Sequence, residues 1–207
     1  MSRLSGLVVA GGQSRRLGTD KRAARVGTLT LLERAVALLA EVSDDVMTAG
    51  PRDAGTVAEA GVRFVPDPVP DRGPMAGILA GLRHARHPRL LVIPVDMPML
   101  TAAFLRFLAG RDPDAAVTVP RWRAGVEPLV AVYHRTCAAD LADRVARGTT
   151  ALHTFIVSTA RPVRFVDEPE IRAYGDPARL FLNINTPGDL IRAERLLREP
   201  PAPPGPP

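Results

Sequence analysis

Cysteine and aromatic residues are scarce in this 207-residue chain, and each scarcity excludes a class of protein. A single cysteine, Cys137, leaves no internal disulfide framework and no cysteine-based zinc site. The four histidines show no metal-ligand pattern. Aromatic residues make up only 4% and the basic residues are scattered, so stacking platforms for single-stranded nucleic acid are lacking. We therefore expect no nucleic-acid partner, although the net charge is +5.

Long apolar runs are also missing from the sequence. No uninterrupted apolar stretch reaches the roughly 18 residues that cross a bilayer, and the N-terminus lacks the pattern of a secretory signal. With 46% hydrophobic residues the chain can still bury a sizeable core. We expect a soluble, cytoplasmic protein without a membrane partner, with one domain over 1–199 and a Pro-rich, disordered tail over 200–207.

Lysine occurs only once among the 27 basic residues, as Lys21. It lies in a Gly-rich loop that follows the first expected strand. A lysine ammonium is a compact point charge on a flexible stem, whereas a guanidinium is a rigid planar fork. The position of this lone ammonium supports a phosphate site in the loop; chance is the alternative explanation.

The alternation of apolar runs with helical patterns predicts an α/β fold. We expect a Rossmann-like three-layer αβα sandwich whose sheet is mostly parallel, with an antiparallel strand over 129–133. The other expected strands cover 6–10, 46–49, 62–65, 89–95, 115–119, 163–166 and 181–184, and the expected helices cover 30–42, 54–60, 75–86, 101–109, 137–147, 151–158 and 187–197.

The Gly-rich loop over 10–21 lies at the carboxyl end of a strand, where open α/β sheets bind ligands. Its glycines allow backbone N–H groups to approach phosphate oxygens, and its basic residues neutralise charge. It matches neither the Walker pattern nor the dinucleotide-binding pattern. A βα turn shaped only for tight geometry would explain the glycines, but not the polar residues crowded beside them, which are Ser14, Arg16, Asp20 and Lys21.

Carboxylates and an amide follow three later segments. Asp96 ends the most apolar strand, and a single carboxylate together with substrate phosphates can hold magnesium; the alternative is an Asp that only makes a turn before Pro98. Asp67 follows another strand, and the Gly-rich helix start over 71–77 permits close approach of a base or ribose. Asn185 precedes the helix N-cap Thr186 without being needed for capping, so it is available to orient a metal-bound water or a second substrate.

The loop resembles the Ala-Gly-Gly-x-Ser-x-Arg-Met-Gly-x-Asp-Lys signature of the molybdenum cofactor guanylyltransferases, with Leu17 in place of the usual Met. Three further stretches resemble the same family in the same order: Asp67 with 73–77, then 94–98, then 183–190. The resemblance covers nearly the whole chain except the Pro-rich tail, and it implies a GT-A-like nucleotidyltransferase fold.

The resemblance implies an activity and its substrates. The enzyme would transfer GMP from GTP to the phosphate of molybdopterin or Mo-molybdopterin and release pyrophosphate, with Mg²⁺ as cofactor and molybdoenzyme-maturation proteins as partners. By position, the catalytic residues would be Lys21, Asp96 and Arg16, the nucleotide-binding residues Ala10, Gly11, Gly12, Ser14, Lys21, Asp67, Gly73 and Asp96, the metal ligand Asp96, and the acceptor-binding residues Asn183 and Asn185.

One departure from the family pattern concerns the base. The family often carries Asn after the second strand, and Gly50 stands at that place here. The Gly11-Gly12 pair favours the guanylyl branch, because related cytidylyltransferases usually have Ala-Ala-Gly. Two alternatives stay open: a cytidylyl or sugar- or polyol-phosphate nucleotidyltransferase of the same fold, and a non-catalytic GTP-binding partner in cofactor assembly.

Overall fold

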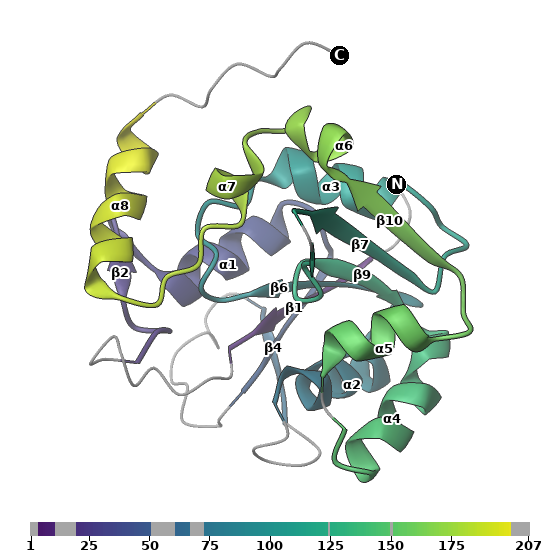
Figure 1. Ribbon diagram of the computed structural model, residues 1–207. Coiled ribbons are helices and arrows are strands. Elements are labelled where there is room, and N and C mark those ends of the chain that lie inside the picture. Colours follow the sequence, from purple (N-terminus) through teal and green to yellow (C-terminus); the bar gives the residue numbers. More distant parts are fainter. Residues whose placement is uncertain are drawn as a thin grey trace.

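The structure is a computed structural model that describes residues 4–10, 20–50, 61–66, 73–123, 125–149 and 151–199. A central mixed sheet lies between two layers of helices (Figure 1). Each face of the sheet carries its own cluster of buried apolar side chains. The expected αβα sandwich is confirmed.

The sheet has the strand order β10-β7-β9-β6-β1-β4-β5, with β8 paired to β7. β1 pairs in parallel with β4 and β6, and β7 pairs in parallel with β10. β9 is antiparallel to both β6 and β7, so β6 and β7 run in the same direction and end at the same edge as β1 and β4. The strands are β1 (Ser5–Val9), β4 (Asp45–Ala49), β5 (Arg63–Val65), β6 (Arg89–Pro94), β7 (Val117–Trp122), β8 (Gly125–Val126), β9 (Ala131–His134) and β10 (Val163–Asp167), and a separate hairpin joins β2 (Arg25–Val26) to β3 (Leu29–Thr30).

Alternate side chains of the buried strands pack against opposite helical layers. In β1, Val8 joins one apolar cluster while Leu7 and Val9 join the other, as the two-residue period of a strand requires. None of the helices within the described ranges has the length and hydropathy needed to cross a bilayer. The first face is covered by α1 (Leu31–Ala40), α3 (Ala102–Gly110), α6 (Glu168–Arg172), α7 (Pro177–Leu180) and α8 (Pro187–Arg198), and the second by α2 (Pro74–His84), α4 (Ala138–Ala146) and α5 (Leu152–Ser158), with a 3-10 turn, η2 (Arg135–Cys137), before α4.

Local capping signals explain where several helices begin. α1, in the helix expected over 30–42, starts with a capping box of Thr30 and Glu33, in which each side chain accepts a hydrogen bond from the other residue's backbone N–H. α2 starts at Gly73, whose φ of +69° favours glycine, and Pro74 occupies the first helical position. These helix starts are confirmed as expected.

The strand expected over 181–184 is wrong. Its alternation of buried Leu182 and Ile184 with exposed Asn183 and Asn185 imitates a half-buried strand. The backbone N–H of Leu182 instead donates to Arg179 O, closing a turn after α7, and that of Ile184 donates to Asp96 O at 2.8 Å. The segment is therefore a connector pinned to the end of β6. The helix expected over 54–60 lies outside the described residues, and the short elements β2, β3, β8, α6 and α7 were not expected.

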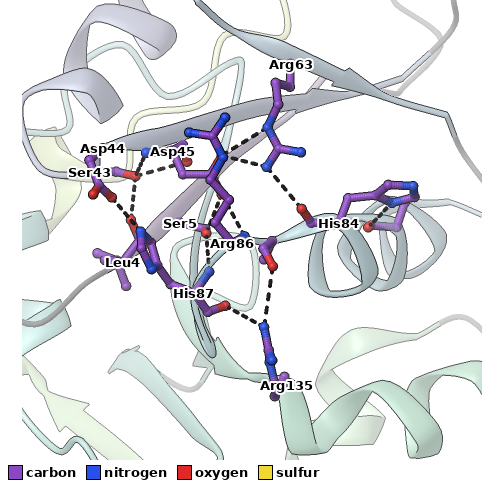
Figure 2. Close-up of polar contacts among 12 residues, drawn as sticks. Leu4, Ser5, Ser43, Asp44, Asp45, Arg63, His84, Arg86, His87 and Arg135 are labelled. Carbon is purple, nitrogen blue, oxygen red and sulfur yellow. Dashed lines mark hydrogen bonds and ion pairs between the residues drawn. The ribbon is translucent and has the colours of Figure 1, made fainter.

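A buried carboxylate, that of Asp45, links several strands at the amino end of the sheet, where β1 and β4 begin (Figure 2). Asp45, only 3% exposed, accepts hydrogen bonds from the Ser5 hydroxyl at 2.6 Å, from the Arg86 backbone N–H at 3.0 Å and from the Arg63 guanidinium. Burial by itself raises the pKa of Asp45, but these donors outweigh burial and leave the pKa below its ordinary value. The network joins β1, β4, β5 and the start of β6 without touching the edge where the strands end.

Candidate active site

Three polar side chains meet at the carboxyl edge of the sheet. The Lys21 ammonium donates to Asp96 Oδ2 at 2.8 Å and to Asn185 Oδ1 at 2.7 Å. The Lys21 and Asp96 side chains are largely buried, at 17% and 20% exposure. The only lysine of the chain therefore links two residues that lie 75 and 164 positions away.

Backbone hydrogen bonds fix Asp96 at this place. The Val95 N–H donates to Val9 O at 3.1 Å, which continues the pairing of β6 with β1 past the last paired residues. The carbonyl of Asp96 accepts from Ile184 N–H at 2.8 Å. Asp96 lies in the turn that follows β6, where these hydrogen bonds hold it between the end of β1 and the segment that carries Asn185.

A tight turn presents Lys21. The Asp20 carboxylate accepts from the Arg22 backbone N–H at 3.0 Å and from the Arg22 guanidinium, and the Ala24 N–H donates to Asp20 O. The hydrogen bond from the Arg22 side chain is the main reason why the pKa of Asp20 is lowered, so this carboxylate is ionised at neutral pH. In the Asp20-Lys21 pair, the carboxylate therefore forms the turn from which the ammonium reaches Asp96 and Asn185.

The cap of α8 also orients Asn185. The Asp189 carboxylate accepts from the backbone N–H groups of Asn185, at 3.0 Å, and Thr186, at 2.8 Å. These donors, led by the Asn185 N–H, lower the pKa of Asp189. The N-cap expected at Thr186 is confirmed; it forms a capping box with Asp189, whose carboxylate also accepts from the residue before the cap. The helix start therefore holds the backbone from which Asn185 reaches Lys21.

The ends of β1 and β4 approach each other closely where the family often has Asn. The Ala10 N–H donates to Ala49 O at 2.8 Å, and a Cβ built on Gly50 would lie 3.3 Å from the carbonyl carbon of Ala10. Any side chain at this position requires its neighbour to shift. The absence of an Asn side chain at Gly50 therefore coincides with a close approach of the chain ends that follow β1 and β4.

The structure brings some of the expected site residues together and leaves others apart. Lys21 is in direct contact with Asp96 and Asn185, Ala10 directly follows β1, and Gly73 begins α2. Asn183 is exposed and has no hydrogen bond among the residues that the structure describes. Gly11, Gly12, Ser14, Arg16 and Asp67 lie outside the described residues.

One polar pair at the same edge was missed by sequence reasoning. The Trp122 indole N–H donates to Glu127 Oε1 at 2.7 Å across the β7–β8 hairpin. Burial raises the pKa of Glu127, although the hydrogen bond from Trp122 works against it. The available sequence signal was weak: a carboxylate directly before Pro128, a few residues after the only tryptophan.

The oxygens at the site suit a hard divalent cation. Asp96 Oδ2 and Asn185 Oδ1 both accept from one ammonium, so they face a common point that a cation can occupy. Oxygen ligands of this kind, completed by water and substrate phosphates, are what magnesium prefers. Among the described residues no group of three or more His, Cys, Asp and Glu side chains could hold a metal.

Comparison with known proteins places the chain in a family. The MobA-like NTP transferase domain matches residues 6–163. A probable molybdenum cofactor guanylyltransferase from Chloroflexus aggregans is 37% identical, over 90% of this chain and 91% of the relative. The solved structure of molybdopterin-guanine dinucleotide biosynthesis protein A from Archaeoglobus fulgidus is 25% identical, has a TM-score of 0.78, and overlaps over 94% of this chain and 98% of the other.

A second solved structure shares the fold and holds a metal. Rv0371C from Mycobacterium tuberculosis, in complex with manganese, is 20% identical, has a TM-score of 0.65 and overlaps over 94% of this chain and 99% of the other. The family model covers well over half of the chain. The chain belongs to the MobA-like NTP transferase family.

Proposed function

We propose that the chain transfers GMP from GTP to the phosphate of molybdopterin and releases pyrophosphate. The observation that carries this proposal is the contact of Lys21 with Asp96 and Asn185 at the carboxyl edge of the sheet. It joins a residue of the phosphate-loop motif to the carboxylate expected to bind metal. The names of the near-full-length relatives specify guanine and the molybdenum cofactor.

The reaction needs positioning and neutralisation of charge. A phosphate oxygen of the acceptor attacks the α-phosphorus of GTP in line, a new P–O bond forms, and the bond from the α-phosphorus to the bridging oxygen of pyrophosphate breaks. No covalent enzyme intermediate is required. The protein contributes by orienting the two phosphates and by placing positive charge where negative charge develops. Lys21 supplies such a charge from a turn that Asp20 holds.

Mg²⁺ is the metal that we assign to this site. Asp96 and Asn185 would hold it, because their oxygens already converge on one positive charge. When bound, the ion would neutralise phosphate oxygens during transfer. The test is a titration of metal-free protein with Mg²⁺ and with Mn²⁺ in the presence of GTP and molybdopterin, followed by pyrophosphate release.

The remaining loop and strand-end residues complete the proposed site. We assign the phosphates of GTP to the backbone of Gly11 and Gly12 and to the side chains of Ser14 and Arg16. Ala10 and Gly73 would contact the nucleotide, Asp67 the nucleoside, and Asn183 the acceptor. The loop motif, and the exposure of Asn183 beside Asn185, support these assignments.

A molybdopterin-dependent pyrophosphate assay with each of the four nucleoside triphosphates tests the proposal. We expect release with GTP and none above background with ATP, CTP or UTP. Release with CTP in place of GTP would make the chain a cytidylyltransferase. Binding of GTP without any release of pyrophosphate when molybdopterin is present would instead support a non-catalytic partner in cofactor assembly.

A further inference from the structure

The proposed chemistry does not use the Trp122–Glu127 pair of the β7–β8 hairpin. The indole N–H of Trp122 donates to Glu127 Oε1 at 2.7 Å. The other carboxyl oxygen of Glu127 has no hydrogen-bond or ionic partner among the residues that the structure describes. The side chain is nevertheless partly buried. This second oxygen is not one of the fully buried polar atoms that lack a partner, so it can accept from water or from a ligand that carries N–H donors.

The hairpin holds this carboxylate in a defined place. The Glu127 N–H donates to Pro120 O at 3.0 Å, and the Val130 N–H donates to Glu127 O at 2.9 Å. The turn between β7 and β8 contains Arg123 with a φ of +51°, a conformation unusual for a residue with a side chain. The guanidinium of Arg123 lies over the Trp122 ring, 4.3 Å from its centroid. The indole is therefore fixed by its neighbours, and it fixes Glu127 in turn.

The pair lies at the same edge of the sheet as the candidate active site. β7 runs parallel to β6, so Trp122 at the end of β7 and Asp96 after β6 lie at the same end of the sheet. The Trp122 ring packs 5.6 Å from the ring of Phe181. Phe181 begins the connector whose Ile184 N–H is bound to Asp96. Figure 1 shows β7 and the chain that leads into α8 on this side of the molecule. One aromatic contact thus links the hairpin to the segment that carries Asn185.

We propose that Glu127 recognises the acceptor, by accepting hydrogen bonds from the ring N–H and the amino group of its 2-amino-4-oxopyrimidine edge. That edge belongs to the pterin of molybdopterin, and the assignment rests on the function proposed above. Two adjacent N–H donors match the two oxygens of a carboxylate. Trp122 is a positioning residue, because it touches the carboxylate rather than the ligand. The burial that raises the pKa of Glu127 is offset when such donors bind the charged form.

The guanine base of GTP has the same pair of N–H donors as the pterin. The position of Glu127 in the sheet is therefore needed to decide which of these two rings it contacts. In the strand order, β1 and β4, which lead into Ala10 and Gly50, lie on one side of β6 and of the Asp96 that follows it, and β7 lies on the other side. GTP is assigned to the first side by the phosphate loop that follows β1. Glu127 on the opposite side therefore faces the acceptor.

The test compares Glu127→Gln with the wild-type enzyme by steady-state pyrophosphate release, varying molybdopterin at saturating GTP and GTP at saturating molybdopterin. Glutamine keeps an oxygen for the Trp122 N–H but removes the charge and presents an amino group to the ligand. Loss of a hydrogen bond to a charged group weakens binding by about tenfold to a hundredfold. We expect the KM for molybdopterin to rise by about that factor and the KM for GTP to change less than twofold.

Two further variants separate recognition from folding. Trp122→Phe keeps an aromatic ring against Phe181 but removes the N–H, and a smaller rise in the KM for molybdopterin is expected. Glu41→Gln removes a carboxylate at the C-cap of α1 that pairs with Arg106 at 3.7 Å, and both KM values should stay unchanged. Thermal unfolding of each variant shows whether it is folded.

Each outcome is decisive. An unchanged KM for molybdopterin in folded Glu127→Gln would mean that the carboxylate only satisfies the indole. A rise confined to the KM for GTP would assign Glu127 to the guanine base and overturn the acceptor assignment. If the wild-type enzyme itself releases no pyrophosphate with GTP and molybdopterin, the proposed function fails, whereas the Glu127 assignment fails only when the wild type is active and the variant is unaffected.

Discussion

Replacing the single lysine tests the centre of the proposed mechanism. Lys21 donates to Asp96 Oδ2 at 2.8 Å and to Asn185 Oδ1 at 2.7 Å, from a side chain that is 17% exposed. Lys21→Ala removes a preorganised charge from the edge where the phosphates are expected. Loss of one such group typically costs about 10²–10³ in kcat, or about 3–4 kcal/mol of transition-state stabilisation. We expect a loss of this size, with little effect on folding because Asp96 can be reached by water.

The same contact predicts a change in metal dependence. In the described structure the ammonium occupies the point that Asp96 and Asn185 face, so it competes with a divalent cation for the carboxylate. Lys21→Ala should therefore lower the Mg²⁺ concentration that gives half-maximal activity, although the maximal rate falls. Lys21→Arg should fail to restore the rate, because a planar fork does not fit a position shaped for a point charge.

The assay is pyrophosphate release at saturating GTP and molybdopterin, measured across a Mg²⁺ titration for Lys21→Ala, Lys21→Arg and the wild type. Arg106→Ala is the matched control, since it removes a cation that is 55% exposed and contacts Glu41 at the far end of α1. A kcat for Lys21→Ala within about threefold of the wild type would contradict the charge argument. Full activity of Lys21→Arg would contradict the geometric argument.

Three more changes test other parts of the molecule. Asp96→Asn should lower pyrophosphate release at least about a hundredfold while GTP binding, followed by thermal shift, persists; near-normal turnover would remove Asp96 from the metal site. Asp45→Asn should cost about 3 kcal/mol of unfolding free energy in denaturant titrations at pH 7, because it breaks a buried ion pair. Since the pKa of Asp45 is lowered on folding, the stability that its charge adds is complete above the unfolded pKa of about 4 and disappears as the pH falls through the folded pKa. A difference in unfolding free energy between variant and wild type that persists in strong acid would refute the assignment of this stability to the charge of Asp45. Thr186→Ala should cost about 1 kcal/mol of stability, and because the same capping box orients Asn185, it should also lower kcat; a stability loss with an unchanged kcat would separate the cap from the site.

Local signals made much of the fold predictable. The capping box of Thr30 and Glu33 and the Pro74 helix start need only residues adjacent in sequence, and both are confirmed. The run over 181–184 misled because its alternating burial is produced by contacts with the end of β6 and not by a strand partner. Two-residue strands such as β8 carry too few residues for any periodicity to show.

The sequence predicted which residues belong to the site, but not which of them contact one another. The motifs indicated Lys21, Asp96 and Asn185 separately, and only folding shows that one ammonium bridges the other two across 164 positions. Glu127 was missed because a glutamate in a hairpin is ordinarily solvated. Its importance depends on burial and on an indole partner, which are properties of the tertiary structure.

The reversed strand β9 sets a distance inside the proposed site. Because β9 lies between β6 and β7, the ends of these two parallel strands are two strand spacings apart, about 10 Å. One end leads to Asp96 and the other to the hairpin of Glu127. The separation is set by the hydrogen-bonding of the sheet, which side-chain motion does not alter. The fold therefore selects acceptors by length. An acceptor whose phosphate and ring are separated by this distance can reach the Asp96 and Glu127 regions at once, whereas a shorter acceptor cannot.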